Sequence, residues 1–302
     1  FVQSISASAL EQLANDFRYN LELDQGDDEY KALGEELHEL VFADVEPLLR
    51  EKSVETLLVI PDGILRTIPF SAFFDGDQYM IEKYAIATTP GISLTFPKRL
   101  DVQEATLFAG GISHSVQGFS SLPGVPGELD KLQDQHGAQI LHNEEFQRST
   151  IEAQLSSEQY SIVHIATHGH FDSNPQQSYL LTYDGKLTMD LLEQSIGSRQ
   201  QTGNTLDLLV LSACETAVGD NRAALGLAGV ALKAGARSAV ASLWQISDAA
   251  TVLIIGSFYD HATKDHISKA QALKKAQNEL INSERHSHPS DWAPFLLIGN
   301  WL

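Results

Sequence analysis

The chain has 302 residues, of which 43% are hydrophobic and 20% are charged, a composition ordinary for one large globular domain or two smaller ones. Asp and Glu number 40 against 20 Lys and Arg, and the resulting charge of −20 argues against a nucleic-acid backbone or an anionic membrane surface as the partner. No apolar run approaches the roughly 20 residues that span a bilayer.

The chain has a single cysteine, Cys214, which excludes an internal disulfide and a cysteine-rich zinc site. We therefore expect a reducing, cytoplasmic location. Phe1 is not an initiator Met, and the residues after it do not form a signal peptide, so we expect a piece of a longer protein. A lone cysteine is ordinarily an inert buried side chain, and its surroundings decide whether it is reactive.

Residues 1–100 are expected to form a helical and partly extended N-terminal subdomain. Leucines and valines recur at spacings of three and four over residues 29–51, which predicts one amphipathic helix whose last turn is kinked or shortened by Pro47. Two apolar runs that end at Pro-Gly or Pro-Asp-Gly turns predict strands over residues 56–60 and 84–89.

From about residue 101 short apolar strands alternate with helical stretches. The expected strands cover residues 106–109, 139–141, 162–166, 208–211, 238–243 and 295–298, and the expected helices cover 128–136, 150–155, 224–234, 248–264 and 267–283. Continuous apolar strands separated by helices indicate a mostly parallel sheet covered on both faces. We therefore expect an α/β domain of about six strands over residues 101–302.

Two of these strands run directly into reactive side chains. The strand at 162–166 leads to His168-Gly169, and the strand at 208–211 leads to Cys214. In an open parallel sheet, sites lie beyond the carboxyl ends of the strands. If the two strands are neighbours, His168 and Cys214 face each other at the edge of the sheet.

This pair suits covalent catalysis. A free thiol has a pKa of about 8.5, so Cys214 needs a base such as His168 to become a nucleophile near neutral pH. The backbone N–H groups of Gly169 and Cys214 are candidates for an oxyanion hole, where one donor is typically worth ~3 kcal/mol. A metal site formed by His164, His168 and His170 is the alternative, but four strand residues span roughly 13 Å, too far for ligands of one ion. We expect His164 to be a packed core histidine and no metal to be present.

Several strings of residues, in a specific order and spacing, carry a resemblance to a known family. They are His164-Ile165-Ala166-Thr167-His168-Gly169, Leu211-Ser212-Ala213-Cys214-Glu215-Thr216, Gly226-Leu227-Ala228-Gly229 with Ala234-Gly235-Ala236, and Ser242-Leu243-Trp244-Gln245-Ile246-Ser247-Asp248. Further matches are Pro61-Asp62-Gly63, Ile68-Pro69-Phe70, Leu122-Pro123-Gly124 and Asp291-Trp292-Ala293-Pro294-Phe295. Together they resemble the CHAT domain, which belongs with caspases, separases, gingipains and clostripain, over roughly residues 30–302.

The resemblance implies a caspase-like sandwich and a Cys–His dyad at Cys214 and His168, with Gly169 and Cys214 supplying the oxyanion hole. In the related separases, the acidic residue of a Leu-Trp-x-x-x-Asp stretch lies in the S1 pocket and binds a basic P1 side chain. Asp248 matches that position, with Trp244 as a pocket wall. The alternatives are that Asp248 is the N-cap of the following helix and that Trp244 is a core residue.

The function we expect is that of a cysteine endopeptidase, a bacterial effector or signalling protease that cleaves proteins or peptides through a thioester acyl-enzyme. It needs no cofactor, and the resemblance implies an upstream helical-repeat or sensor partner. One alternative is a catalytically latent or inactive regulatory binding module with the same fold. The other is a different thiol acyl-transfer enzyme, such as an amidase.

Overall fold

The computed structural model describes residues 3–23, 28–95, 97–101, 104–157, 159–171, 177–200, 205–212, 215–216, 229, 232, 235–264 and 267–302. Cys214 lies outside these residues, as does nearly all of the helix expected at 224–234.

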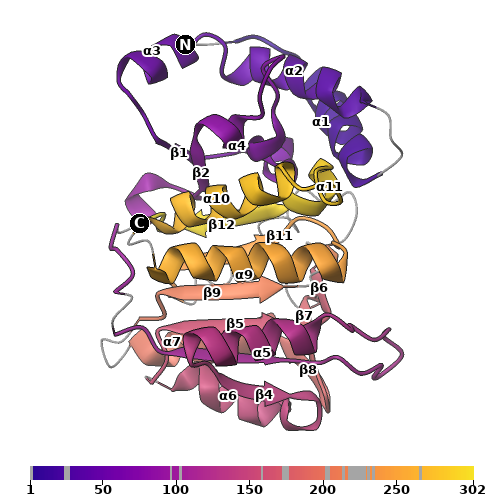
Figure 1. Cartoon of the computed structure of the whole chain (residues 1–302), viewed down its shortest axis with the longest axis vertical. Helices are drawn as coiled ribbons and strands as arrows, with labels where there is room; N and C mark the ends of the chain where they lie inside the picture. The colour runs from indigo at the N-terminus through magenta and orange to yellow at the C-terminus, as the bar shows by residue number, and fades with distance from the viewer. Residues whose placement is uncertain are drawn as a thin grey trace.

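One eight-stranded sheet runs through the middle of the molecule (Figure 1). Its order is β1-β2-β12-β11-β9-β5-β3-β4, and all neighbours are parallel except β11 and β12. The strands are β1 (Thr56–Val59), β2 (Ala85–Thr88), β3 (Leu107–Gly111), β4 (Gln139–His142), β5 (Ile162–Ala166), β9 (Leu208–Ser212), β11 (Ser238–Ser242) and β12 (Phe295–Gly299). The mostly parallel α/β sheet is confirmed: six of its strands follow residue 101, and two come from the first hundred residues.

Helices cover both faces of this sheet. On one face lie α5 (Val125–His136), α9 (Asp248–Lys264) and α10 (Lys269–Ile281), and on the other lie α6 (Arg148–Ser156) and α7 (Met189–Gln200). The side chains of β5 alternate between the two apolar layers, with Ile162 and Ala166 in the first and Val163 and Ile165 in the second. Alternation on a strand buried on both faces explains why its sequence reads as a continuous apolar run.

A second, smaller sheet extends from the end of β5. It has the order β10-β6-β7-β8 and contains β10 (Glu215–Thr216), β6 (Gly169–Phe171), β7 (Tyr179–Thr182) and β8 (Gly185–Thr188). Strands this short carry too little periodicity to be recognised in the sequence. The small sheet matters for function because both β6 and β10 directly follow strands of the large sheet.

The helix expected over residues 29–51 differs from the observed structure, and the expected domain boundary at residue 100 stays a prediction. Residues 29–51 form two helices, α2 (Glu29–Val41) and α3 (Glu46–Glu51), and not one, because Pro47 lies in the first turn of α3, where its missing N–H needs no partner. Helix α2 packs on α1 (Ala7–Glu22), and these two lie with α3 and α4 (Met80–Lys83) above β1 and β2 in Figure 1, whereas α11 (Pro289–Trp292) lies against α10. Short 3₁₀ helices also occur in the described part of the chain: η1 (Gly63–Thr67), η2 (Phe70–Ala72), η3 (Ile92–Leu94) and η4 (Asn143–Glu145).

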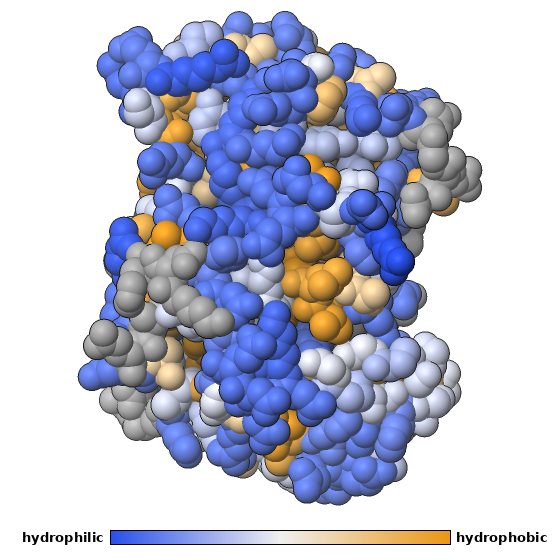
Figure 2. All heavy atoms as spheres, in the orientation of Figure 1, coloured by the Kyte–Doolittle hydropathy of each residue, from blue (hydrophilic) through white to orange (hydrophobic). Residues whose placement is uncertain are grey.

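Most side chains on the face drawn in Figure 2 are hydrophilic, as the charge of the chain suggests. One apolar area lies over α9, where Leu253 is 49% exposed. Within the described residues, none of the helices has the length and apolar character needed to cross a membrane.

Candidate active site

The carboxyl ends of β3, β5, β9 and β11 meet at one edge of the sheet, because these four strands are parallel neighbours. In the β5–β9 register, Ala166 pairs with Ser212. His168 follows Ala166 by two residues, and Cys214 follows Ser212 by two residues. The two strands are therefore neighbours, as the sequence interpretation required, and their carboxyl ends lie at the same level of the sheet. The side chain of Cys214 lies outside the described residues, so the dyad stays a prediction.

The imidazole of His168 is held by the loop that follows β3. Its Nε2 lies 2.8 Å from the carbonyl oxygen of Ser120, and its ring packs against Phe119 with 5.2 Å between the centroids. A carbonyl oxygen can only accept a hydrogen bond, so Nε2 carries the proton. In the neutral ring this leaves the lone pair on Nδ1, the nitrogen that is then available to a thiol.

The backbone N–H of Gly169 is not used in the pairing of β6 with β7. Leu181 N–H donates to His168 O over 2.8 Å, which makes His168 and Leu181 the hydrogen-bonded pair where β6 meets β7. Gly169 and Leu180, which follow in the register, are then a non-hydrogen-bonded pair. The β6–β7 ladder therefore does not use the N–H of Gly169, in keeping with its expected place in an oxyanion hole.

The loop carrying Ser120 is fixed near its start and near its middle. Asn143, in a left-handed conformation with φ of 50°, accepts through Oδ1 from the N–H groups of Ser113 and His114 over 2.9 and 3.2 Å. The amide of Gln117 donates to the carbonyl oxygen of Thr182 in the β7–β8 hairpin over 2.8 Å. The sequence carries no signal for Ser120, Asn143 and Gln117, because a backbone carbonyl has no residue signature and the other two belong to no motif.

The same loop ends against Asp248. The Oδ2 atom of Asp248, which is half-buried, accepts from the N–H of Gly124 over 3.0 Å. The N-cap of α9 is Ser247, whose hydroxyl accepts from Ala250 N–H over 3.3 Å, and Asp248 is the first helical residue. The alternative that Asp248 is the N-cap is therefore wrong. Its Oδ1 accepts no hydrogen bond from the residues that the structure describes.

Trp244 is packed into the core beneath this region. The residue is 6% exposed, and its Nε1 donates to the carbonyl oxygen of Ser290 over 3.2 Å. The guanidinium of Arg18, from α1, lies over the ring with its Cζ 5.9 Å from the centroid. Such burial supports the core role that the sequence left open and leaves little of the ring for a pocket wall.

The histidines considered for a metal site have different surroundings. His164 is fully buried, as expected, with its Nε2 3.0 Å from Oε1 of Glu128. The half-buried ring of His170 packs against Tyr179, with 5.8 Å between the centroids. In the described part of the chain, no group of three or more His, Cys, Asp or Glu side chains has an arrangement that could hold a metal ion.

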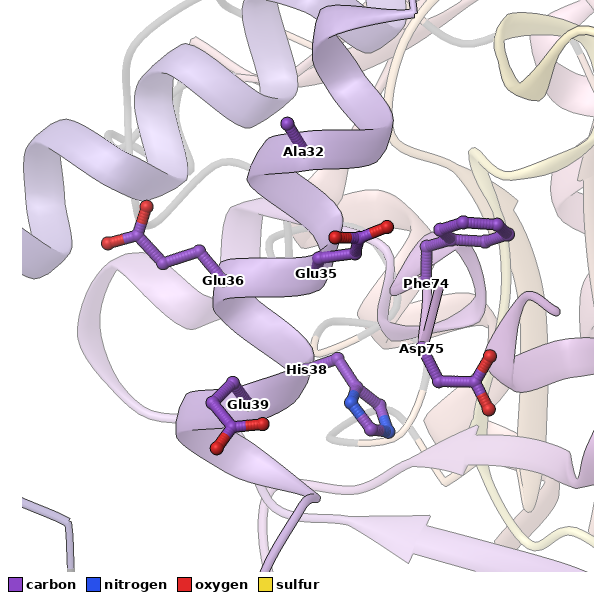
Figure 3. A pocket seen from close by; sticks show the side chains of 7 residues that line it. All are labelled: Ala32, Glu35, Glu36, His38, Glu39, Phe74 and Asp75. Carbon is purple, nitrogen blue, oxygen red and sulfur yellow. The ribbon is translucent and has the colours of Figure 1, made fainter. Parts of the chain in front are cut away.

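A cavity of about 370 Å³ lies in the N-terminal part (Figure 3). It is lined by α2 and by the start of the loop before α4, through Ala32, Glu35, Glu36, His38, Glu39, Phe74 and Asp75. None of these residues lies at the strand ends, and Asp75 is paired with Lys83. We therefore place the candidate active site at the strand ends and not in this cavity.

The fold is similar to those of known cysteine peptidases. The Arg-specific cysteine proteinase gingipain R of Porphyromonas gingivalis superposes with a TM-score of 0.56 and 11% identity, over 98% of this chain and 76% of gingipain R. Separase, in the Saccharomyces cerevisiae separase–securin complex, superposes with a TM-score of 0.55 and 11% identity, over 98% of this chain and 22% of separase. At such identity the likeness concerns the fold alone.

Curated relatives and a family model extend the comparison to sequence. Tetratricopeptide repeat protein 28 from Homo sapiens is 31% identical over 131 residues, which is 43% of this chain and 5% of the relative. The Mus musculus protein of the same name is 34% identical over 98 residues, 32% of this chain and 4% of the relative, so the chain matches only a small part of either. The model of the CHAT domain matches residues 31–300, and the chain therefore belongs to the CHAT domain family.

Proposed function

We propose that this protein is a cysteine endopeptidase in which Cys214 is the nucleophile and His168 the base. The observation that carries the proposal is the β5–β9 register, in which the residues two positions before His168 and Cys214 lie side by side. Neighbouring strands are about 4.8 Å apart, close enough for the side chains that follow them to meet. Membership of a family related to cysteine peptidases supports the same reaction class.

Each step of the reaction has a residue to perform it. His168 is held through Nε2 by the carbonyl of Ser120, so that Nδ1 takes the thiol proton of Cys214. The thiolate attacks the scissile carbonyl, and the N–H groups of Gly169 and Cys214 stabilise the resulting oxyanion. His168 then gives the proton to the leaving amine, which leaves a thioester that water hydrolyses with the help of the same imidazole.

The preferred P1 residue in this proposal is basic. Asp248 has one carboxylate oxygen bound to the N–H of Gly124 and a second that is available to a guanidinium or ammonium group. Carboxylates bind Arg through two parallel hydrogen bonds and bind Lys less specifically. Gingipain R, which shares the fold, is itself an Arg-specific proteinase. The net charge of −20 also favours basic substrates over acidic ones.

The test is a map of cleavage sites in the proteome of the source cells, made by mass spectrometry with the wild type and with Cys214→Ala. We expect cuts after Arg and Lys that disappear in Cys214→Ala and decline in Asp248→Asn, whereas Asp134→Asn, an exposed control, keeps them. Cuts after Leu or Asp would refute the basic P1 preference. A peptide electrophile that fails to label Cys214 in the activated full-length protein would favour the regulatory binding module instead.

A further inference from the structure

A buried polar network lies behind the candidate active site, between the sheet and α5. Its centre is Glu128, which is 4% exposed. One carboxylate oxygen accepts from the hydroxyl of Ser212 over 3.2 Å, and the other lies 3.0 Å from Nε2 of His164. Ser212 belongs to β9 and His164 to β5, and both are 1% exposed or less. A single carboxylate therefore joins the two neighbouring strands that lead to the proposed dyad.

The fourth member of the network comes from α9. The hydroxyl of Tyr259 lies 3.4 Å from Nδ1 of His164, and the two rings meet edge to face. Complete burial raises the pKa of Tyr259 well above its usual value, and the charge of Glu128 adds to the effect, so the hydroxyl remains a neutral donor. The Tyr259 hydroxyl and the Glu128 carboxylate therefore face the two different ring nitrogens of His164, Nδ1 and Nε2.

Stability alone does not account for a carboxylate at this position. Moving a charge from water into a packed core is costly, and an apolar side chain of similar size often fills such a place at least as well. The hydrogen bond from Ser212 is directional, however, and apolar packing would not reproduce it. It ties α5 to β9, and the close approach of the carboxylate to the ring of His164 places β5 beside them.

The members of the network lie close in sequence to the residues of the proposed active site. Ser212 precedes Cys214 by two residues, His164 precedes His168 by four, and Glu128 follows Ser120 by eight. We propose that Glu128 is a positioning residue for the dyad, holding the strands of Cys214 and His168 and the loop of Ser120 in one arrangement. This inference rests on the proposed function and deepens it, because Glu128 acts through Ser212 and His164 and does not touch the substrate.

The test measures the thiol of Cys214 directly in Glu128→Gln, which keeps the size of the side chain and removes its charge. The pH dependence of alkylation by iodoacetamide reports the thiol pKa, and a reporter peptide with a basic P1 residue gives kcat and KM. We expect a kcat at least tenfold lower with KM within twofold of the wild type, and a thiol pKa that rises toward the free value of about 8.5. Loss of a negative charge alone would move that pKa in the opposite direction, so the sign separates positioning from a charge effect.

Two controls isolate the role of Glu128. Asp130→Asn makes the same charge change on an exposed residue of α5 and should leave alkylation and kcat unchanged. Leu155→Ala truncates a buried side chain in the opposite apolar layer and should lower stability without moving the thiol pKa. If the pH profile of alkylation in Glu128→Gln equals that of the wild type, or is shifted to lower pH, the inference is overturned. A wild-type thiol that already titrates near 8.5 would refute the dyad and, with it, any positioning role.

Discussion

The contact between Gly124 and Asp248 leads to a sharp prediction for Gly124→Ala. A Cβ at this position would lie 2.8 Å from the Cβ of Asp248 and 3.2 Å from its carbonyl oxygen. Carbon atoms pack at roughly 3.5–4.0 Å, so the loop or the start of α9 must move. The backbone of Gly124, with φ of −75° and ψ of −27°, suits alanine, so no backbone strain is added.

The magnitude follows from two opposing effects. Overpacking of this kind costs about 1–3 kcal/mol. Replacing glycine by alanine lowers the entropy of the unfolded chain and gains about 0.4–1 kcal/mol. We therefore expect Gly124→Ala to lower the free energy of unfolding by about 1–2 kcal/mol, mostly from the overpacking.

Gly127→Ala is the matched control, because it lies three residues further on in α5 and its new Cβ would meet no atom within 4 Å. It should raise the free energy of unfolding by about 0.5–1 kcal/mol. Urea denaturation of the two variants measures the difference between them. A Gly124→Ala protein as stable as Gly127→Ala would refute the close packing of the loop on Asp248.

Two further predictions concern charged groups in the N-terminal part. Burial alone would raise the pKa of Asp75, but the ion pair with Lys83 and two backbone N–H groups lower it to about 2. The ion pair therefore stabilises the fold above about pH 4, and this stabilisation is lost as the pH falls toward 2. The stability gap between wild type and Lys83→Met, measured by urea denaturation, should therefore shrink from pH 7 to pH 3, and an equal gap at both would contradict the pairing. Arg18→Met should lower the free energy of unfolding by about 1.5–3 kcal/mol, because the buried guanidinium donates to the carbonyl of Leu243 over 3.1 Å. A near-neutral result would mean that this contact contributes nothing to stability.

The large sheet was predictable from the sequence because its strands are buried on both faces and read as unbroken apolar runs. The same feature located the ends of β5 and β9, and thereby His168 and the position of Cys214. Helix α9 was predicted with its observed bounds, Asp248–Lys264. The break between α2 and α3 was missed, although Pro47 is the residue that favours a new helix start there.

The surroundings of the candidate site were less predictable, since they depend on contacts between distant segments. Ser120 acts through its backbone carbonyl, which is the same for every residue type. Glu128 looks in the sequence like any acidic residue in the first turn of a helix, where such residues are common. Only the packing of α5 against β5 and β9 reveals that its carboxylate is buried and bound.

The dyad is tested most directly by titrating the thiol of Cys214, which needs no substrate and is unambiguous because the chain has one cysteine. The rate of alkylation is measured against pH in the wild type and in His168→Ala. We predict a wild-type thiol pKa well below the free value of about 8.5, and a return to about 8.5 in His168→Ala. Identical profiles in the two proteins would contradict the pairing of Cys214 with His168.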